Sequence, residues 1–254
     1  MLSSFIVHGL TEQDLVAESV MQILAGGETT ATGLRATFLH IITNPRIYAT
    51  LRAEIDDVVN SKGKISGSII KDTEWRHLVY LQAVIKEGLR IWPPVTGMMS
   101  KFSPPGGDEF EVDGEKVFIP GSSNIGWASW GIHRNQAVFG EDAELYRPER
   151  WLDKRNPEKL ERMRKVVDLN FGYGKYYCLG RLIALSELHK VIFEVRYYLS
   201  QDTSYVVEVG IKLILRQLFR NFDFEIVSPS RPWKSENVGI WMQSEMWVRV
   251  TERN

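Results

Sequence analysis

Residues 171–180 read FGYGKYYCLG, and no other stretch says as much about how this chain folds. Gly172 and Gly174 permit tight turns and the close approach of a flat ligand, because glycine tolerates backbone angles that other residues avoid. Cys178 stands just before a helix predicted to begin near Gly180, where helix N-terminal amides stabilise a thiolate. Such a thiolate can be a nucleophile or a metal ligand, whereas a lone cysteine is more commonly buried and inert.

The sequence before this stretch is mostly helical in its spacing. Thr11 with Asp14 three positions later is typical of a capping box, and apolar residues then recur at helical intervals. Asn44-Pro45 predicts the end of that helix and the start of a second one. A third helix is predicted from about residue 74 to residue 91, where Pro93-Pro94 stops it.

Short strands are predicted between and after the helices. Asp113-Gly114 lies between alternating apolar residues, which is typical of a hairpin turn. Residues 222–250 show further short strand-like runs around turn residues. The predicted fold class is therefore mainly α with small β-sheets (α+β).

Three further segments contain charged residues in patterns that can carry a function. Glu87 and Arg90 share one helix face at i, i+3 spacing, and a surface pair of this kind contributes under about 1 kcal/mol. Residues 146–151 read YRPERW and hold Arg150. Residues 25–30 read AGGETT, and the paired glycines alone favour a helix break, since each costs about 1 kcal/mol against alanine.

In their order along the chain, these segments resemble the cytochrome P-450 family. Residues 171–180 match Phe-x-x-Gly-x-x-x-Cys-x-Gly, and residues 87–90 match Glu-x-x-Arg. Residues 146–151 match aromatic-x-Pro-Glu-Arg-aromatic, and residues 25–30 match Ala-Gly-x-Asp/Glu-Thr-Thr. The resemblance covers nearly the whole chain and looks like the fungal pisatin demethylase-type group.

The resemblance implies a haem b cofactor with Cys178 as the axial thiolate ligand of the iron. Phe171 is expected to pack beside the ligand, and Gly174 and Gly180 to shape the loop around it.

The expected contacts to the haem propionates depart from the family pattern. Tyr176 stands where the family usually has Arg or His, so it could hydrogen-bond a propionate but not neutralise it. Lys175 beside it is either a substitute cation or a solvated lysine. Lys101 falls where the family often has a propionate-binding Arg, and lysine lacks the bidentate geometry.

The resemblance also assigns roles to the other segments. Glu28 and Thr29 are expected to relay protons to the dioxygen that the haem activates, in a helix opened locally by its glycines. Glu87, Arg90 and Arg150 are expected to form a buried triad that fixes the loop behind the haem.

The implied activity is hydroxylation or O-demethylation of an apolar small molecule. It would use dioxygen and two electrons from an NADPH-dependent cytochrome P-450 reductase. No cysteine-protease signature, zinc motif or dinucleotide fingerprint supports a competing chemistry.

Composition limits the other classes of function. The chain has 254 residues and a formal net charge of −1, which argues against a nucleic-acid binder that relies on bulk charge. A single cysteine excludes an internal disulfide framework and a multi-cysteine zinc site. No apolar run approaches the roughly 18 residues that a membrane span needs.

A family member normally has about as much sequence again before the long helix. Residues 1–254 are therefore expected to be a partial domain, the C-terminal half of the fold with the N-terminal half missing. A full-length parent is expected at the endoplasmic reticulum membrane, whereas the chain as written predicts no anchor and is cytoplasmic or of unknown location. The alternative is a non-catalytic fragment or incomplete gene product with vestigial haem binding.

Residues 195–217 have no counterpart in the family pattern. They are strand-prone and interrupt the passage from the helix after Cys178 to the C-terminal strands. Two explanations stay open, a retained intron read in frame and a lineage-specific insertion.

Overall fold

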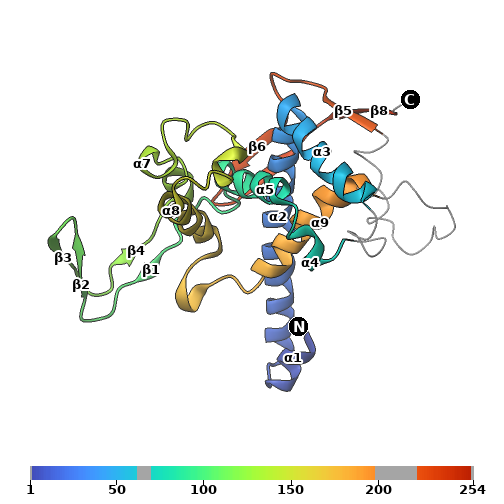
Figure 1. The fold of residues 1–254 in the computed structure, drawn as a ribbon. Coiled ribbons are helices and arrows are strands. Elements are labelled where there is room, and N and C mark those ends of the chain that lie inside the picture. The colour runs from blue at the N-terminus through green and yellow to red at the C-terminus, as the bar shows by residue number, and fades with distance from the viewer. Residues whose placement is uncertain (1, 62–69, 198–221, 253–254) are drawn as a thin grey trace.

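The computed structural model describes residues 2–61, 70–197 and 222–252, and it consists mainly of helices with small sheets (Figure 1). The described helices are α1 (Leu2–Val7), α2 (Glu12–Ile42), α3 (Pro45–Asn60), α4 (Asp72–Trp75), α5 (Val79–Ile91), α6 (Ser129–Ile132), α7 (Gln136–Phe139), α8 (Pro157–Asp168) and α9 (Arg181–Tyr197). The described 3-10 helices are η1 (Pro148–Trp151), η2 (Leu169–Phe171) and η3 (Gly174–Tyr176).

The described strands pair antiparallel in twos. They are β1 (Lys101–Phe102) with β4 (Asn124–Ile125), β2 (Asp108–Val112) with β3 (Glu115–Ile119), β5 (Phe222–Ile226) with β8 (Val248–Glu252), and β6 (Lys234–Asn237) with β7 (Trp241–Ser244). The predicted mainly α class with small β-sheets is confirmed for the described residues.

Local capping signals set the long helices. The Thr11 hydroxyl accepts from Asp14 N at 3.2 Å, and the Asp14 carboxylate accepts from Thr11 N at 3.1 Å, so the predicted capping box is confirmed. The Asn44 side chain accepts from Ile47 N at 3.3 Å and caps α3, with Pro45 at its first position.

Helix α2 differs from the prediction at Gly26 and Gly27. It runs unbroken as an α-helix through both residues, so the expected local opening is not present. A methyl group added at either glycine would meet nothing within 4 Å. The helical hydrogen-bond ladder therefore continues here despite a propensity cost of about 1 kcal/mol per glycine.

The predicted single helix from residue 74 to residue 91 is wrong at its start. Two separate helices occupy this range, and the second, α5, begins only at Val79. Glu54 on α3 accepts the backbone N–H groups of Tyr80 at 2.7 Å and Leu81 at 2.9 Å. A carboxylate from another helix thus caps α5, and nothing in the local sequence announces it.

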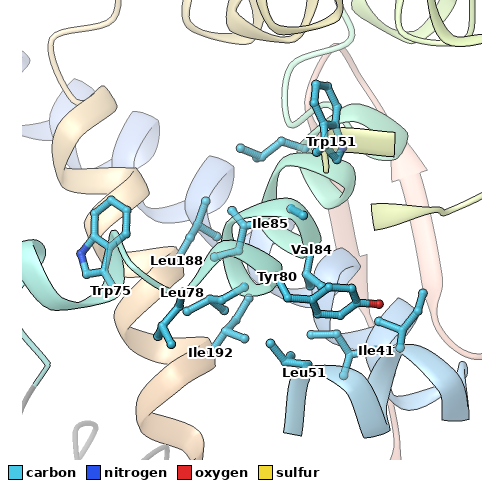
Figure 2. Close-up of a cluster of buried hydrophobic side chains, with 14 of the residues drawn as sticks. Ile41, Leu51, Trp75, Leu78, Tyr80, Val84, Ile85, Trp151, Leu188 and Ile192 are labelled. Carbon is cyan, nitrogen blue, oxygen red and sulfur yellow. The ribbon is translucent and has the colours of Figure 1, made fainter. Parts of the chain in front are cut away.

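Helix α5 lies at the centre of the core, between α2, α3, α9 and η1 (Figure 2). Apart from Val79 at its start, the apolar side chains of α5 are buried, among them Leu81, Val84 and Ile85. Leu188 and Ile192 of α9 pack into the same cluster. The element that carries Glu87 and Arg90 is therefore also the best-packed part of the described chain.

Glycines allow the helices to approach closely. A methyl group on Gly88 of α5 would lie 2.0 Å from the Thr37 hydroxyl oxygen of α2. One on Gly33 of α2 would lie 3.3 Å from methyl groups of Leu188 and Leu89. Helices α2, α5 and α9 therefore meet at these small residues.

The β2–β3 hairpin extends away from the helical core in Figure 1. Asp113 and Gly114 occupy its turn with φ of 52° and 84°, the backbone that a tight hairpin requires, so this prediction is confirmed. Within the described residues, no helix has the length and apolar character to cross a membrane. Of the expected 195–217 insertion, residues 195–197 belong to α9 and the rest lies outside the described residues.

Candidate functional site

The cysteine loop, residues 171–180, closes on itself just before α9. Cys178 N donates to Phe171 O at 2.7 Å and ties the end of the loop to its start. Gly172 has φ +73°, and a methyl group there would lie 2.6 Å from Tyr176 O. Only glycine fits this position, and the resulting turn leaves Cys178 exposed at the mouth of α9.

The two other predicted glycines lie in the same loop. Gly174 has φ +60°, so it also needs the freedom of glycine. A methyl group on Gly180 would stand 3.7 Å from the Cys178 sulfur, an ordinary contact distance. The guanidinium carbon of Arg181 lies over the Phe171 ring, 5.5 Å from the ring centroid. Arg181 also forms an ion pair with Asp168 at 2.9 Å.

The predicted propionate-binding residues converge on this loop. Lys101 of β1 donates from Nζ to Tyr173 O at 2.7 Å, although 72 residues separate the two in sequence. The same ammonium lies 5.0 Å from the centroid of the Tyr176 ring, and the Lys175 ammonium lies 5.9 Å from that centroid. Two cations and a phenol therefore gather at one side of the loop.

The surroundings of Cys178 fit a haem. Leu179, the next residue, and Leu182, in the first turn of α9, are 99% and 73% exposed, so exposed apolar side chains follow the thiol in the chain. The Lys101 ammonium group provides a positive charge at the same loop, where it binds Tyr173 O. A soft sulfur donor, an apolar face and a cationic edge match a flat apolar iron complex with acidic substituents.

Glu28 and Thr29 are placed on α2, one turn before its contact with α9 at Gly33. The Thr29 hydroxyl donates to Ala25 O at 2.6 Å. The Glu28 carboxylate is directed instead toward Arg35, at 4.0 Å. Both side chains are partly exposed, and each has a different nearest polar partner.

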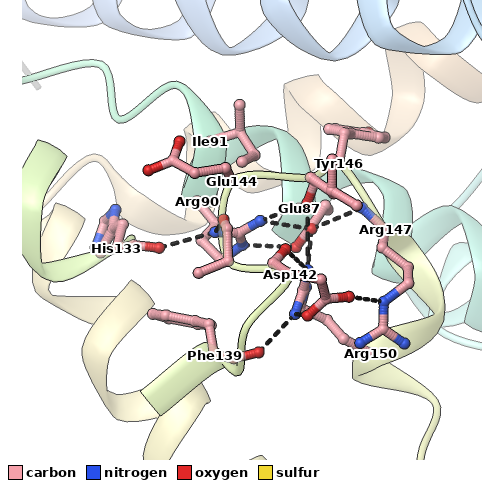
Figure 3. A network of polar contacts seen from close by, with 12 residues as sticks. Glu87, Arg90, Ile91, His133, Phe139, Asp142, Glu144, Tyr146, Arg147 and Arg150 are labelled. Atoms are coloured by element: carbon pink, nitrogen blue, oxygen red, sulfur yellow. Dashed lines mark hydrogen bonds and ion pairs between the residues drawn. The ribbon is translucent and has the colours of Figure 1, made fainter. Parts of the chain in front are cut away.

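The structure brings Glu87, Arg90 and Arg150 together in the core (Figure 3). Arg90 binds the Glu87 carboxylate through Nη2 at 2.8 Å and Nε at 2.9 Å. Arg150 Nε donates to the same carboxylate at 2.9 Å, and the three side chains are at most 2% exposed. This is a fully desolvated, charge-assisted network.

Every N–H of the two guanidinium groups has an acceptor. The remaining Arg90 donors bind the backbone oxygens of His133, Ala143 and Leu145. Those of Arg150 bind the Asp142 carboxylate and the backbone oxygens of Phe139, Asp142 and Leu145. The network therefore holds residues 133–145 against α5.

Sequence reasoning missed several members of this network. Trp151 Nε1 donates to Glu87 at 2.9 Å, and Arg147 N donates to it at 2.8 Å. Asp142 pairs with both Arg147 and Arg150; burial alone would raise the pKa of its carboxyl, but these two arginines lower it on balance. Trp151 belongs to the matched motif and could have been found, whereas Asp142 stands in no motif.

The chain matches a known protein family and several curated proteins. The family model described as Cytochrome P-450 matches residues 5–195. Cytochrome P-450 monooxygenase ABA1 of Pyricularia oryzae is 40% identical over 253 residues, which are 100% of this chain and 44% of that protein. Cytochrome P-450 monooxygenase aba1 of Botryotinia fuckeliana is also 40% identical, over 99% of this chain and 44% of its own length.

Pisatin demethylase of Fusarium vanettenii is 33% identical over 216 residues, which are 85% of this chain and 35% of that protein. The chain thus spans less than half the length of these curated relatives. Because the family model covers most of the chain, the chain belongs to the cytochrome P-450 family.

Proposed function

We propose that this chain is the haem-binding part of a monooxygenase and that Cys178 is its axial ligand to haem b. The observation that carries the proposal is the exposed cysteine in a loop closed by the bond from Cys178 N to Phe171 O. Its position just before α9 leaves the sulfur exposed, so an iron could reach it. When bound, the haem would supply the activation of dioxygen.

Lys101, Lys175 and Tyr176 would hold the acidic edge of the haem. Lys101 donates to Tyr173 O, and an ammonium group has three donors, so two others can serve a carboxylate. Tyr176 can add a neutral hydrogen bond from its exposed phenol. Gly174 and Gly180, which have no side chains, would leave room for the haem at this loop.

Glu28 and Thr29, both on α2, would move protons in the reaction. The Thr29 hydroxyl already donates its hydrogen to Ala25 O, so its lone pairs remain able to accept a hydrogen bond from another donor. Glu28 is the nearest acid in sequence, and its partly exposed carboxyl can exchange protons with water.

Glu87, Arg90 and Arg150 would act through structure alone. Their hydrogen bonds fix residues 133–145 against α5, and α5 leads directly into the segment that ends at Lys101. The triad would thereby fix the position of the segment that ends at Lys101 relative to the cysteine loop.

For the whole protein we propose hydroxylation or O-demethylation of an apolar small molecule. Electrons would come from an NADPH-dependent cytochrome P-450 reductase, and a full-length parent would reside at the endoplasmic reticulum membrane. The relatives named monooxygenases and pisatin demethylase support this class of reaction. The chain spans less than half of each, so the remainder of such a protein would supply much of the substrate pocket.

A reduced carbon-monoxide difference spectrum tests the proposal. The full chain, supplied with haemin, should give a strongly red-shifted Soret band that Cys178→Ser abolishes. Val112→Ala, which removes an exposed apolar side chain on the β2–β3 hairpin, should retain the band. A band that is absent, or that survives Cys178→Ser, would refute the proposal and favour a non-catalytic fragment with vestigial haem binding.

A further inference from the structure

Trp127 carries a buried donor for which the described residues provide no acceptor. Its indole Nε1 has no access to solvent and no hydrogen-bond partner. An indole N–H can only donate, and a buried donor without an acceptor is unfavourable. Trp127 belongs to none of the motifs that place the haem.

The strand register places Trp127 on the same face as Lys101. In the β1–β4 pair, Lys101 lies opposite Ile125. Met99 N donates to Trp127 O at 3.4 Å and continues that pairing by two residues. Directly opposed residues share a face and the pattern repeats every second residue, so these side chains project to one side.

Lys101 and Trp127 are also close in space. The Lys101 ammonium lies 5.9 Å from the centroid of the Trp127 ring and 5.0 Å from that of Tyr176. Its one acceptor among the described residues is Tyr173 O in the cysteine loop. A cation with spare donors thus adjoins an indole N–H that lacks an acceptor.

We infer that Trp127 is a haem-binding residue, which donates its indole N–H to a propionate that Lys101 also binds. The inference rests on the proposed function and adds a residue to the same site. A carboxylate suits this pair because it only accepts hydrogen bonds and carries the opposite charge to Lys101. It would supply the acceptor that Trp127 lacks and compensate for the missing Arg or His two residues before Cys178.

The test compares two porphyrins that differ only at the acidic edge. The full chain is titrated with ferric protoporphyrin IX and with its dimethyl ester, and affinities are read from the Soret absorbance. A charge-assisted hydrogen bond is worth roughly a 10- to 100-fold change in affinity. Trp127→Phe should weaken binding of the diacid by about that factor and weaken binding of the diester much less, because an ester carbonyl accepts only a neutral hydrogen bond.

Lys101→Met should reduce the preference for the diacid in the same way. Trp247→Phe is the matched control, because this indole is 69% exposed and should leave both affinities unchanged. The apo form of Trp127→Phe should unfold at the wild-type temperature or higher, since the substitution removes an unsatisfied donor.

A Trp127→Phe variant that keeps the wild-type preference for the diacid would overturn the inference, whatever its melting temperature. Failure of the proposed function is recognised separately. The proposed function fails if the wild-type chain binds neither porphyrin, and the inference then fails with it. It also fails if Cys178→Ser leaves the spectrum of the bound iron unchanged.

Discussion

Replacing Glu87 by Gln should lower the free energy of unfolding by about 4 kcal/mol. Oε2 of the carboxylate accepts from Arg90 Nε and Trp151 Nε1, both at 2.9 Å, and Oε1 accepts three further N–H groups. An amide nitrogen in place of Oε2 would leave two buried donors unpaired, at about 1–3 kcal/mol each. It would also remove the charge that both buried guanidinium groups share.

The assay is urea unfolding of the full chain, followed by tryptophan fluorescence. A loss of about 4 kcal/mol is a large part of the 5–15 kcal/mol that stabilises a typical domain, so the variant should unfold at a much lower urea concentration than the wild type. Glu109→Gln is the matched control, because its Lys116 partner lies at 2.7 Å but the two side chains are 53% and 78% exposed. It should cost under about 1 kcal/mol. An equally small loss for Glu87→Gln would refute the reasoning.

Three further predictions concern α5 and the buried histidines. Glu54→Ala should cost about 1–2 kcal/mol in urea unfolding, because it uncaps two N–H groups of α5. Gly88→Ala should be more damaging in the same assay, since its methyl group would lie 2.0 Å from the Thr37 hydroxyl. Burial lowers the pKa of His40 and of His133 to about 4. Unfolded histidine takes up a proton near pH 6.5, so stability should fall as pH drops from 6.5 to 4, by about 3 kcal/mol per histidine.

Control variants show whether these losses of stability are specific to the substituted contacts. Gly131→Ala places a methyl group where nothing lies within 4 Å and should be tolerated. Glu111→Ala removes an exposed carboxylate on β2 and should leave stability nearly unchanged. For the histidines, replacement of His133 by Gln should flatten the dependence of unfolding free energy on pH between 4 and 6.5. An unchanged slope would show that other groups dominate it.

The features that could be predicted from sequence are those set by neighbouring residues. The capping box at Thr11, the Asn44-Pro45 junction and the Asp113-Gly114 turn are all fixed within a few positions along the chain. The cysteine loop likewise depends on its own glycines and on the bond from Cys178 N to Phe171 O.

The features that could not be predicted depend on contacts between distant segments. The start of α5 is set by Glu54, 26 residues before Tyr80. Asp142 belongs to the buried network because η1 packs against α5, which places Arg150 within hydrogen-bond distance of Asp142. Trp127 comes beside Lys101 through strand pairing, which no local pattern encodes.

Gly26 and Gly27 show a different limit. Their helix propensity predicts a break, yet α2 continues through them because a 31-residue helix is stabilised by the packing of its later turns. Local propensity is thus outweighed where tertiary contacts hold the rest of the element.

The most direct test of the central claim is the iron K-edge X-ray absorption spectrum of the full chain reconstituted with haemin. Ligation by Cys178 predicts one sulfur scatterer in the first shell of the iron, which Cys178→Ser replaces by oxygen or nitrogen. A first shell of nitrogen and oxygen alone in the wild-type chain would contradict the account.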